Sequence, residues 1–284
     1  MRYVKVIHII ILLLVINASC TERMDIRLDN SFTLLVVDGS ITNETKAHKV
    51  VLSRTSSYFY NQPPLMVSGA QVTITVGGHT FDLTEKSPGI YLTEPIVFGI
   101  PKYTYTLNIK LLEEIGGYTD YTASSLLNPV NPIDSIELEF NPDYSEKGTW
   151  EVKSYAQDPL TADFYRFMIY RNRILVTDTL KEWNVIDDKF FNGYYANGAT
   201  IGFLHQSRPD EKLKEGDIVT AEINSIGKEY ANFLWDTQSE LYGSNPIFSG
   251  PPANVKGNIN NGGIGFFAAY SVSRASITTP NINK

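Results

Sequence analysis

Short stretches in which apolar and polar residues alternate recur along most of the chain. The clearest are residues 70–76, 79–83, 103–109 and 136–140, and residues 217–226 are a further strand candidate. Alternation with a period of two puts successive side chains on opposite faces of an extended strand, so each stretch predicts a β-strand with one buried face. The pattern therefore predicts a mainly β protein.

Three dipeptides separate strands in the first half of this pattern. Asp38-Gly39, Gly77-Gly78 and Gly116-Gly117 are typical of tight turns, because Gly adopts positive φ without steric cost. Short strands at regular spacing around such turns are typical of a β-sandwich of immunoglobulin-like size, which we expect over residues 32–126.

A stiff segment is expected to end this first domain. Residues 127–133 contain two Asn-Pro pairs, which disfavour helix and favour an extended linker. We place a second β-rich domain over 134–276 and a loose tail over 277–284. The fold class predicted is thus two β-sandwich, immunoglobulin-like domains.

The second domain departs from simple alternation in two places. Residues 185–195 mix acidic, aromatic and glycine residues and predict a long exposed hairpin. Residues 228–242 lie between two glycines and predict one amphipathic helix, because their large apolar residues recur at near-helical spacing. These residues are Tyr230, Phe233, Leu234, Trp235 and Leu241.

The first twenty residues have the features of an export signal. Arg2 and Lys5 precede an apolar run over 9–16, and small residues lead into Cys20. This predicts a signal peptide over 1–19. The apolar run is well short of the roughly 20 residues that a membrane-spanning helix needs.

The end of this leader resembles the lipobox of bacterial lipoproteins, whose cysteine is acylated. Ala18, Ser19 and Cys20 fit that pattern, while Asn17 departs from it because an apolar residue is usual there. The resemblance implies lipidation at Cys20, attachment to a membrane through the lipid, and a tether over 20–31. The alternative is an exported protein with a chance cysteine near its cleavage site.

Composition limits the partners and the chemistry. The net charge is −7 and no cluster of Lys and Arg occurs, which argues against binding nucleic acid. With Cys20 as the one cysteine, no disulfide forms within the chain. The 17 Tyr, 14 Phe and 3 Trp residues suit β-sheet cores and cross-strand pairs.

No catalytic or metal-binding motif stands out in the sequence. His48, His79 and His205 lack metal-ligand spacing, so each is interpreted as a strand or loop histidine. The adjacent acids of Glu113-Glu114 and of Asp187-Asp188 would point to opposite faces of a strand, which makes them poor acid and base partners. The sequence predicts no catalytic residues, no metal, no cofactor and no enzymatic activity.

Two groups of aromatic residues are the candidate contacts for a ligand or partner. The flat rings, with Asn and Gly beside them, suit a sugar, a peptide or a partner protein. The alternative is that they fold back over the sandwich edge. The candidate residues are Tyr58, Phe59 and Tyr60 in the first domain and Phe190, Phe191, Tyr194 and Tyr195 in the second.

Several strand and turn motifs resemble a Bacteroidetes lipoprotein family known as domain of unknown function 4249. After the leader, these motifs are Val36–Ile41, Val50–Thr55 with Tyr58-Phe59, Pro63-Pro64 with Val67–Val72, Gly257–Ile259 and Gly265–Phe267. The resemblance implies an outer-membrane, lipid-anchored companion of TonB-dependent transporters, acting in substrate capture or as a lid. It carries no known catalytic residues.

We therefore expect a non-catalytic outer-membrane lipoprotein that assists a TonB-dependent β-barrel in nutrient uptake, with an oligosaccharide or peptide as ligand. The alternative is a structural or adhesive surface lipoprotein that binds a partner protein. An exported hydrolase is the weakest hypothesis, because no nucleophile and base arrangement is visible.

Overall fold

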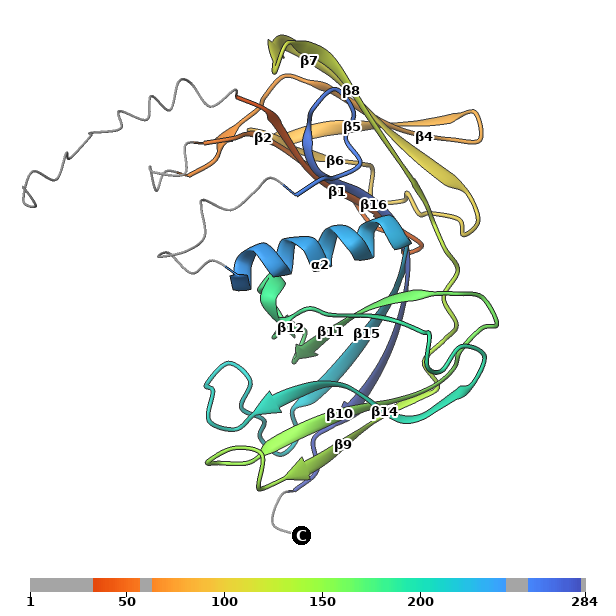
Figure 1. The fold of residues 1–284 in the computed structure, drawn as a ribbon, viewed down its shortest axis with the longest axis vertical. Helices are drawn as coiled ribbons and strands as arrows, with labels where there is room; N and C mark the ends of the chain where they lie inside the picture. The colour runs from red at the N-terminus through yellow and green to blue at the C-terminus, as the bar shows by residue number, and fades with distance from the viewer. Residues whose placement is uncertain (1–32, 57–62, 244–254, 282–284) are drawn as a thin grey trace, which may run out of the picture. The chain divides into compact units, whose positions relative to one another are not determined.

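Strands dominate the structure, as the alternating pattern predicts (Figure 1). The computed structural model describes residues 33–56, 63–243 and 255–281. The strands are β1 (Leu35–Thr42), β2 (Lys49–Arg54), β3 (Leu65–Met66), β4 (Gln71–Val76), β5 (His79–Ser87), β6 (Ile90–Leu92), β7 (Thr104–Ile115), β8 (Tyr118–Leu126), β9 (Ser135–Asn141), β10 (Thr149–Gln157), β11 (Phe164–Arg171), β12 (Ile174–Leu175), β13 (Asn184–Asp187), β14 (Tyr195–His205), β15 (Ile218–Ile226) and β16 (Ile264–Thr278).

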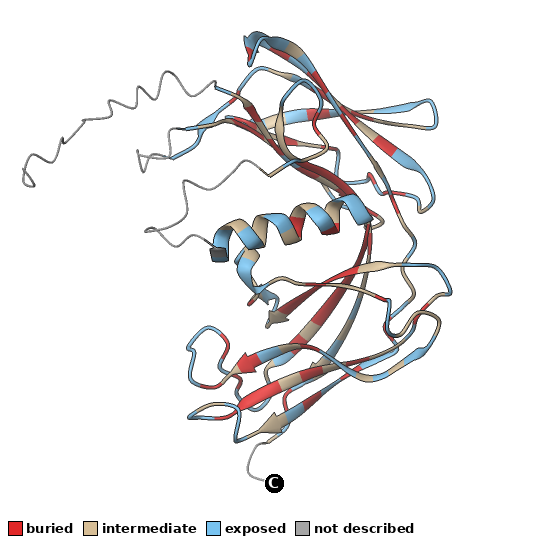
Figure 2. Ribbon diagram, viewed as in Figure 1, coloured by how far each residue is buried: buried red, intermediate tan, exposed pale blue. Residues whose placement is uncertain are grey.

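These strands form two sheets. The larger has the order β12-β11-β15-β16-β1-β2-β6-β5-β4-β7-β8, with β13 beside β11 and β3 beside β2. The smaller has the order β14-β10-β9. Buried residues follow the strands in both sheets (Figure 2). A mainly β fold is therefore confirmed, whereas the immunoglobulin-like sandwich in each half is not.

Strand β16 connects the two halves of the chain. Its first part pairs in parallel with β1, and its second part pairs antiparallel with β15. Two of the sequence motifs, in β1 and at the start of β16, thus lie side by side, with Gly39 opposite Phe267. The Asn258 side chain bonds both the N–H and the C=O of Phe267, at 2.9 and 2.8 Å. This side chain occupies the place of a backbone partner for β16.

The segment 127–133 differs from the predicted linker. The described residues from 33 onward form one compact unit. Asn128 bridges Tyr270 of β16, and Ser271 Oγ donates to Asn128 O at 2.5 Å. These two contacts hold the segment against β16.

Two hydrophobic cores nevertheless lie on either side of this segment. The first draws on β1 to β8, ends at Leu127, and is completed from the far end of the chain by Ile259 and Phe267. The second begins at Ile133 and draws on β9 to β15. The predicted tail also differs, because Ile277 and Thr278 belong to β16 and Ile277 packs against the second core.

Two local predictions differ from the structure. Asp38-Gly39 lies inside β1 rather than in a turn. A Cβ on Gly39 would stand 3.0 Å from a Val50 methyl, so close packing accounts for the glycine. Residues 185–195 are not a hairpin, because β13 pairs with β11 of the larger sheet while β14 pairs with β10 of the smaller.

The predicted helix is confirmed as α2 (Lys228–Gly243). It lies against β11, β13, β16 and the short 3-10 helix η1 (Leu180–Glu182) (Figure 1). Ala231 and Leu234 are buried in a third core, and the rings of Tyr230 and Phe233 pack on Phe266. Leu241 is exposed instead of packed. Within the described residues, no helix combines the length and apolarity that crossing a membrane requires.

Candidate functional site

The candidate site is the loop over residues 188–194, which joins β13 to β14. It lies against the loop over residues 158–163, which joins β10 to β11. Gly193 N donates to Pro159 O at 2.9 Å, and Asp158 N donates to Tyr194 O at 3.1 Å. The two loops thus brace one another where the two sheets of the second half meet.

Asp188 fixes the start of this loop. Its side chain is buried and accepts the Asp163 N–H at 2.8 Å. Its carbonyl oxygen accepts from the N–H groups of Phe191 and Asn192, at 2.8 and 2.7 Å. These bonds close a tight turn, so the backbone of the loop is held in place without a ligand.

Asp158 fixes the end of the loop. One carboxylate oxygen accepts the Tyr165 hydroxyl at 2.8 Å, and the other accepts Gly193 N–H at 3.0 Å. Gly193 has φ +77°, and a Cβ there would stand 2.6 Å from Leu160 Cδ2. Glycine is favoured because the backbone is left-handed here, whereas the tip of the exposed Leu160 side chain could move aside.

Three large side chains project from these loops into solvent. The exposed fractions are 95% for Phe190, 72% for Tyr194 and 89% for Leu160. Tyr195, on the first residue of β14, is half-exposed. Rings this exposed are candidates for contact, because burial against a partner would remove apolar area from water. We call Leu160, Phe190, Tyr194 and Tyr195 the aromatic patch.

Phe191 points the other way. Its ring stacks on Tyr165, with ring centres 6.5 Å apart, and packs against the second core. The sequence-predicted group is therefore divided: Phe190, Tyr194 and Tyr195 are available for contact, whereas Phe191 folds back. Phe191 thus folds back as the alternative expected, while contact through the other three rings stays a prediction.

Carboxylates surround the inner side of the loop. Burial raises the pKa of Asp163, and the nearby charges of Asp188 and Asp158 raise it further. Burial also raises the pKa of the Tyr165 hydroxyl, together with its bond to Asp158. Among the described residues no group of His, Cys, Asp and Glu is placed to hold a metal ion. The carboxylates of Asp158 and Asp188 accept hydrogen bonds that hold the loop.

Two cavities open between the sheets, and the first of them lies beside the loop. The first, of about 150 Å³, is lined by Phe191, Tyr165 and Asp158 among others. The second, of about 330 Å³, is lined by more polar groups, including Glu182, Arg208 and Glu211. Residues Thr200 and Ile201 of β14 border both. Asn184 Nδ2 donates to Ile201 O at 3.0 Å and so ties β13 to β14 at that border.

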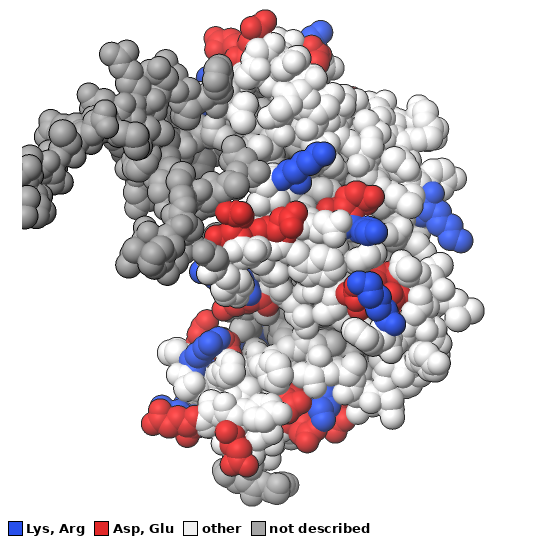
Figure 3. Space-filling view, viewed as in Figure 1, with Lys and Arg blue, Asp and Glu red and all other residues white. Residues whose placement is uncertain are grey.

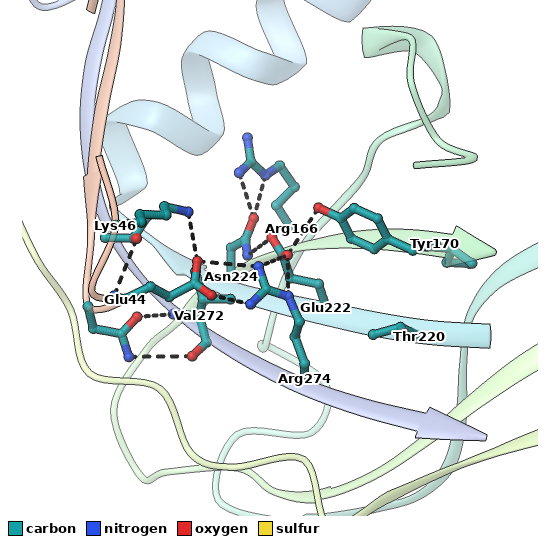
Figure 4. Close-up of polar contacts among 12 residues, drawn as sticks. Glu44, Lys46, Arg166, Tyr170, Thr220, Glu222, Asn224, Val272 and Arg274 are labelled. Atoms are coloured by element: carbon teal, nitrogen blue, oxygen red, sulfur yellow. Dashed lines mark hydrogen bonds and ion pairs between the residues drawn. The ribbon is translucent and has the colours of Figure 1, made fainter. Parts of the chain in front are cut away.

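A buried polar network lies elsewhere, beneath α2 (Figure 4). The Arg166 guanidinium is 3% exposed, lies over the rings of Trp183 and Tyr270, and donates twice to Asn224 Oδ1. Asn224 in turn donates to Glu222 at 2.7 Å.

The network continues to the surface through Arg274. This side chain pairs with Glu222 at 2.6 Å and with Glu44 of the β1–β2 connection. Two arginines and two glutamates are thus joined in a line from α2 to β1. The network fastens elements together, because each of its buried polar groups already has a partner within the chain.

Several predicted residues lie outside the described part of the chain. Cys20, Tyr58, Phe59 and Tyr60 are among them. Leu160 and Asp158 were missed by the sequence reasoning. Asp158-Pro159-Leu160 looks like an ordinary interstrand turn, and only the pairing of β14 with β10 brings it beside Gly193.

The surface charge is mixed. On the face shown in Figure 3, acidic and basic side chains are interspersed with uncharged surface between them. Around the aromatic patch, Lys189 pairs with Asp187 at 2.5 Å. Contact through the patch would thus depend mainly on the rings.

Comparison with known proteins gives a family but no function. Residues 21–276 match the family model described as Domain of unknown function (DUF4249), which confirms the resemblance drawn from the strand and turn motifs. No curated protein matches the chain. The family description names neither a ligand nor an activity for the site.

Proposed function

We propose that this chain, which belongs to the family described as Domain of unknown function (DUF4249), is a non-catalytic binding protein, lipid-anchored at the bacterial outer membrane, that captures a ligand for a TonB-dependent transporter. The observation that carries the proposal is the aromatic patch on its fastened loop. Binding surfaces of this kind lose little conformational entropy when a partner arrives, because the loop is already ordered.

The fastening distinguishes the patch from ordinary surface aromatics. Asp158 and Asp188 hold both ends of the loop from its inner side, while Phe190 and Tyr194 remain outside. Contact of these two rings with a ligand would remove apolar surface from water, and the loop would not have to become ordered first. A sugar ring or a peptide backbone fits such flat faces.

The proposed anchor explains how a modest binding surface would suffice. Acylation of Cys20 would hold the protein at the membrane, at about 0.8 kcal/mol per buried CH₂ group. An anchored protein and a transporter in the same membrane meet at a high effective concentration. Ligand captured by the patch would thus be delivered without tight binding in solution.

A second exposed surface favours contact with a partner protein. Ile96, Phe98 and Ile100 alternate outward, while Val97 and Gly99 point inward. Gly99 N donates to Thr42 O at 2.7 Å and Ile100 N donates to the Tyr105 hydroxyl at 2.6 Å, so this row is also fastened. It suits the rim of a transporter. It equally suits the alternative function, a structural or adhesive lipoprotein.

The test is co-purification of the tagged, membrane-anchored protein from its own host in mild detergent. The proposal predicts that a β-barrel transporter co-purifies in fixed ratio with the wild-type protein. The Phe190→Ser, Tyr194→Ser double variant should bind the ligand at least tenfold more weakly. This is the loss expected when about 1.4 kcal/mol of binding free energy is removed. Tyr144→Ser, at another exposed ring, is the control.

Two results would count against the proposal. Recovery of the lipoprotein without a transporter would favour the free-standing adhesive alternative. Unchanged capture by the double variant, with an unchanged unfolding transition, would remove the aromatic patch from the binding surface.

A further inference from the structure

The first cavity, beneath the aromatic loop, has a closed apolar floor and an accessible mouth. Phe167, Ile201 and Ile223 are buried and form the floor. Gln157 and Thr200 also line the cavity and are exposed, so they mark its opening to solvent. The cavity therefore lies within reach of a group delivered from outside.

Small side chains account for the empty space. Ser154 and Ala156 of β10, and Ala196 and Ala199 of β14, line one side. The pairing of β10 with β14 also shifts register twice nearby, after Val152 and after Ser154. Protein interiors are normally packed as densely as organic crystals, so a row of small residues facing large ones leaves a real void.

The size and lining of the void fit one aromatic ring. In other proteins a dry apolar cavity of about 150 Å³ holds a benzene molecule. Here the opposite side is built of the rings of Tyr165, Phe167 and Phe191, two of which already stack on one another. Aromatic rings prefer such offset-stacked and edge-to-face neighbours.

A buried carboxylate stands at the side of this cavity. Asp158 lines the cavity, is 7% exposed, and receives two hydrogen bonds, from the Tyr165 hydroxyl and from Gly193 N–H. A carboxylate has about four acceptor positions, so it can take a further donor. Within the described residues, the ion pairs found do not include Asp158.

We propose that this cavity binds a phenol-type ring, with the ring between the small residues of β10 and β14 and the aromatic side, and with the hydroxyl donating to Asp158. The inference rests on the proposed binding function and names the part of the ligand that enters the protein. Two sources supply this chemistry: the tyrosyl side chain of a peptide and a free small phenol. The aromatic patch would contact the rest of the ligand at the mouth.

The test is a titration of the mature chain, labelled at its Ile methyl groups, with p-cresol. The methyl resonances of Ile186, Ile201 and Ile223 should shift and saturate, because these side chains line the cavity. Those of Ile74 and Ile109, in the first core, should stay unchanged. Toluene should bind about tenfold more weakly, since it lacks the hydroxyl that donates to Asp158.

A filling substitution tests the location. Ala196→Leu should fill the void and abolish the p-cresol shifts, while Ala162→Leu, at an exposed position of the neighbouring loop, should leave them unchanged. The Ile74 and Ile109 resonances report that each variant is folded. Absence of p-cresol shifts in the wild type, or wild-type affinity in Ala196→Leu, would overturn the inference.

A second titration, with a tyrosine derivative, distinguishes a peptide's tyrosyl side chain from a free phenol. Binding of N-acetyl-tyrosinamide as well as p-cresol supports the tyrosyl source, and binding of p-cresol alone supports the free phenol. The cavity inference and the proposed function can also be refuted independently. Loss of p-cresol binding with retained transporter capture would remove only the cavity inference, whereas p-cresol binding without transporter capture would remove only the accessory function.

Discussion

His48 is a buried histidine that must be neutral to keep both of its hydrogen bonds. Thr42 N–H donates to Nδ1 at 3.4 Å, so the ring hydrogen lies on Nε2 and is donated to Val97 O at 3.1 Å. Burial, together with the positive charge of Lys46, lowers the pKa of His48 to about 4. A proton added at Nδ1 would face the Thr42 N–H, donor against donor.

This protonation predicts a loss of stability in acid. Between the unfolded pKa of about 6.5 and the folded pKa of about 4, the unfolded chain binds more protons, so the free energy of unfolding falls as the pH falls through that window. At neutral pH the neutral His48 ring contributes roughly 3 kcal/mol to the free energy of unfolding that is lost once the pH falls below the folded pKa. Urea unfolding of wild type and His48→Gln across the window measures it.

The difference between the two proteins isolates this histidine, because all other groups titrate in both. The His48→Gln variant should lose less stability on acidification than wild type. The exposed His79→Gln variant should follow wild type. Equal pH dependence in wild type and His48→Gln would contradict the assignment.

Residue chemistry of this kind was only partly predictable from the sequence. The sequence shows that no other potential metal ligand lies at the usual spacing from His48, but it does not show that His48 is buried. Arg166 shows the limit more clearly. In the sequence it lies in an apolar stretch that predicts a strand. Trp183, Tyr270 and Asn224, which surround its charge, lie after η1, in β16 and in β15. No local pattern brings those four residues together.

The close contact of β1 with β16 depends on one glycine. Gly265 has φ +92°, and a Cβ there would stand 2.0 Å from Val37 O on the paired strand. A side chain at this position would therefore be strained in its backbone and would also push the two strands apart.

Substitution tests this contact with a neighbouring control. Gly265→Ala should lower the free energy of unfolding by more than 3 kcal/mol, because clash adds to strain. Gly262→Ala, with φ +74° and nothing within 4 Å of its Cβ, should cost only about 1 kcal/mol. Urea denaturation compares the two. Equal losses would show that β16 does not approach β1 closely.

At the level of elements, period-two strands and the helix were predictable, but their partners were not. The strands around Gly77-Gly78 and Gly116-Gly117 pair as the hairpins expected, because short turns leave adjacent strands little choice. Residues 185–195 read the same way locally. Their two strands nevertheless join different sheets, because β14 pairs with β10 and β13 pairs with β11, both of which lie earlier in the chain.

The parallel pairing of β1 with β16 organises the whole molecule. It joins residues more than two hundred positions apart, and such pairings leave no local signal beyond two apolar strands. The two Asn-Pro pairs of 127–133 predicted an extended segment, and the two cores lie on either side of it. Composition and spacing could not predict that β16 pairs with a strand of each half.

This arrangement predicts that the first half does not fold alone. A fragment of residues 32–126 lacks the strand beside β1 and the core residues Ile259 and Phe267, so it should show no cooperative urea transition. Joining residues 257–271 to it through a Gly/Ser linker should restore one. Cooperative unfolding of the fragment by itself would support the independent domain predicted from the sequence.

In the proposed function, Phe190 lies where the protein contacts its ligand and the transporter. A photo-crosslinking phenylalanine placed at position 190 of the anchored protein, in living cells of its own host, tests this most directly, with position 144 as the exposed control. The proposed function predicts a ligand-dependent crosslink to a β-barrel transporter from position 190 and none from position 144. Equal products from both positions, or none from 190 while the transporter still co-purifies, would contradict it.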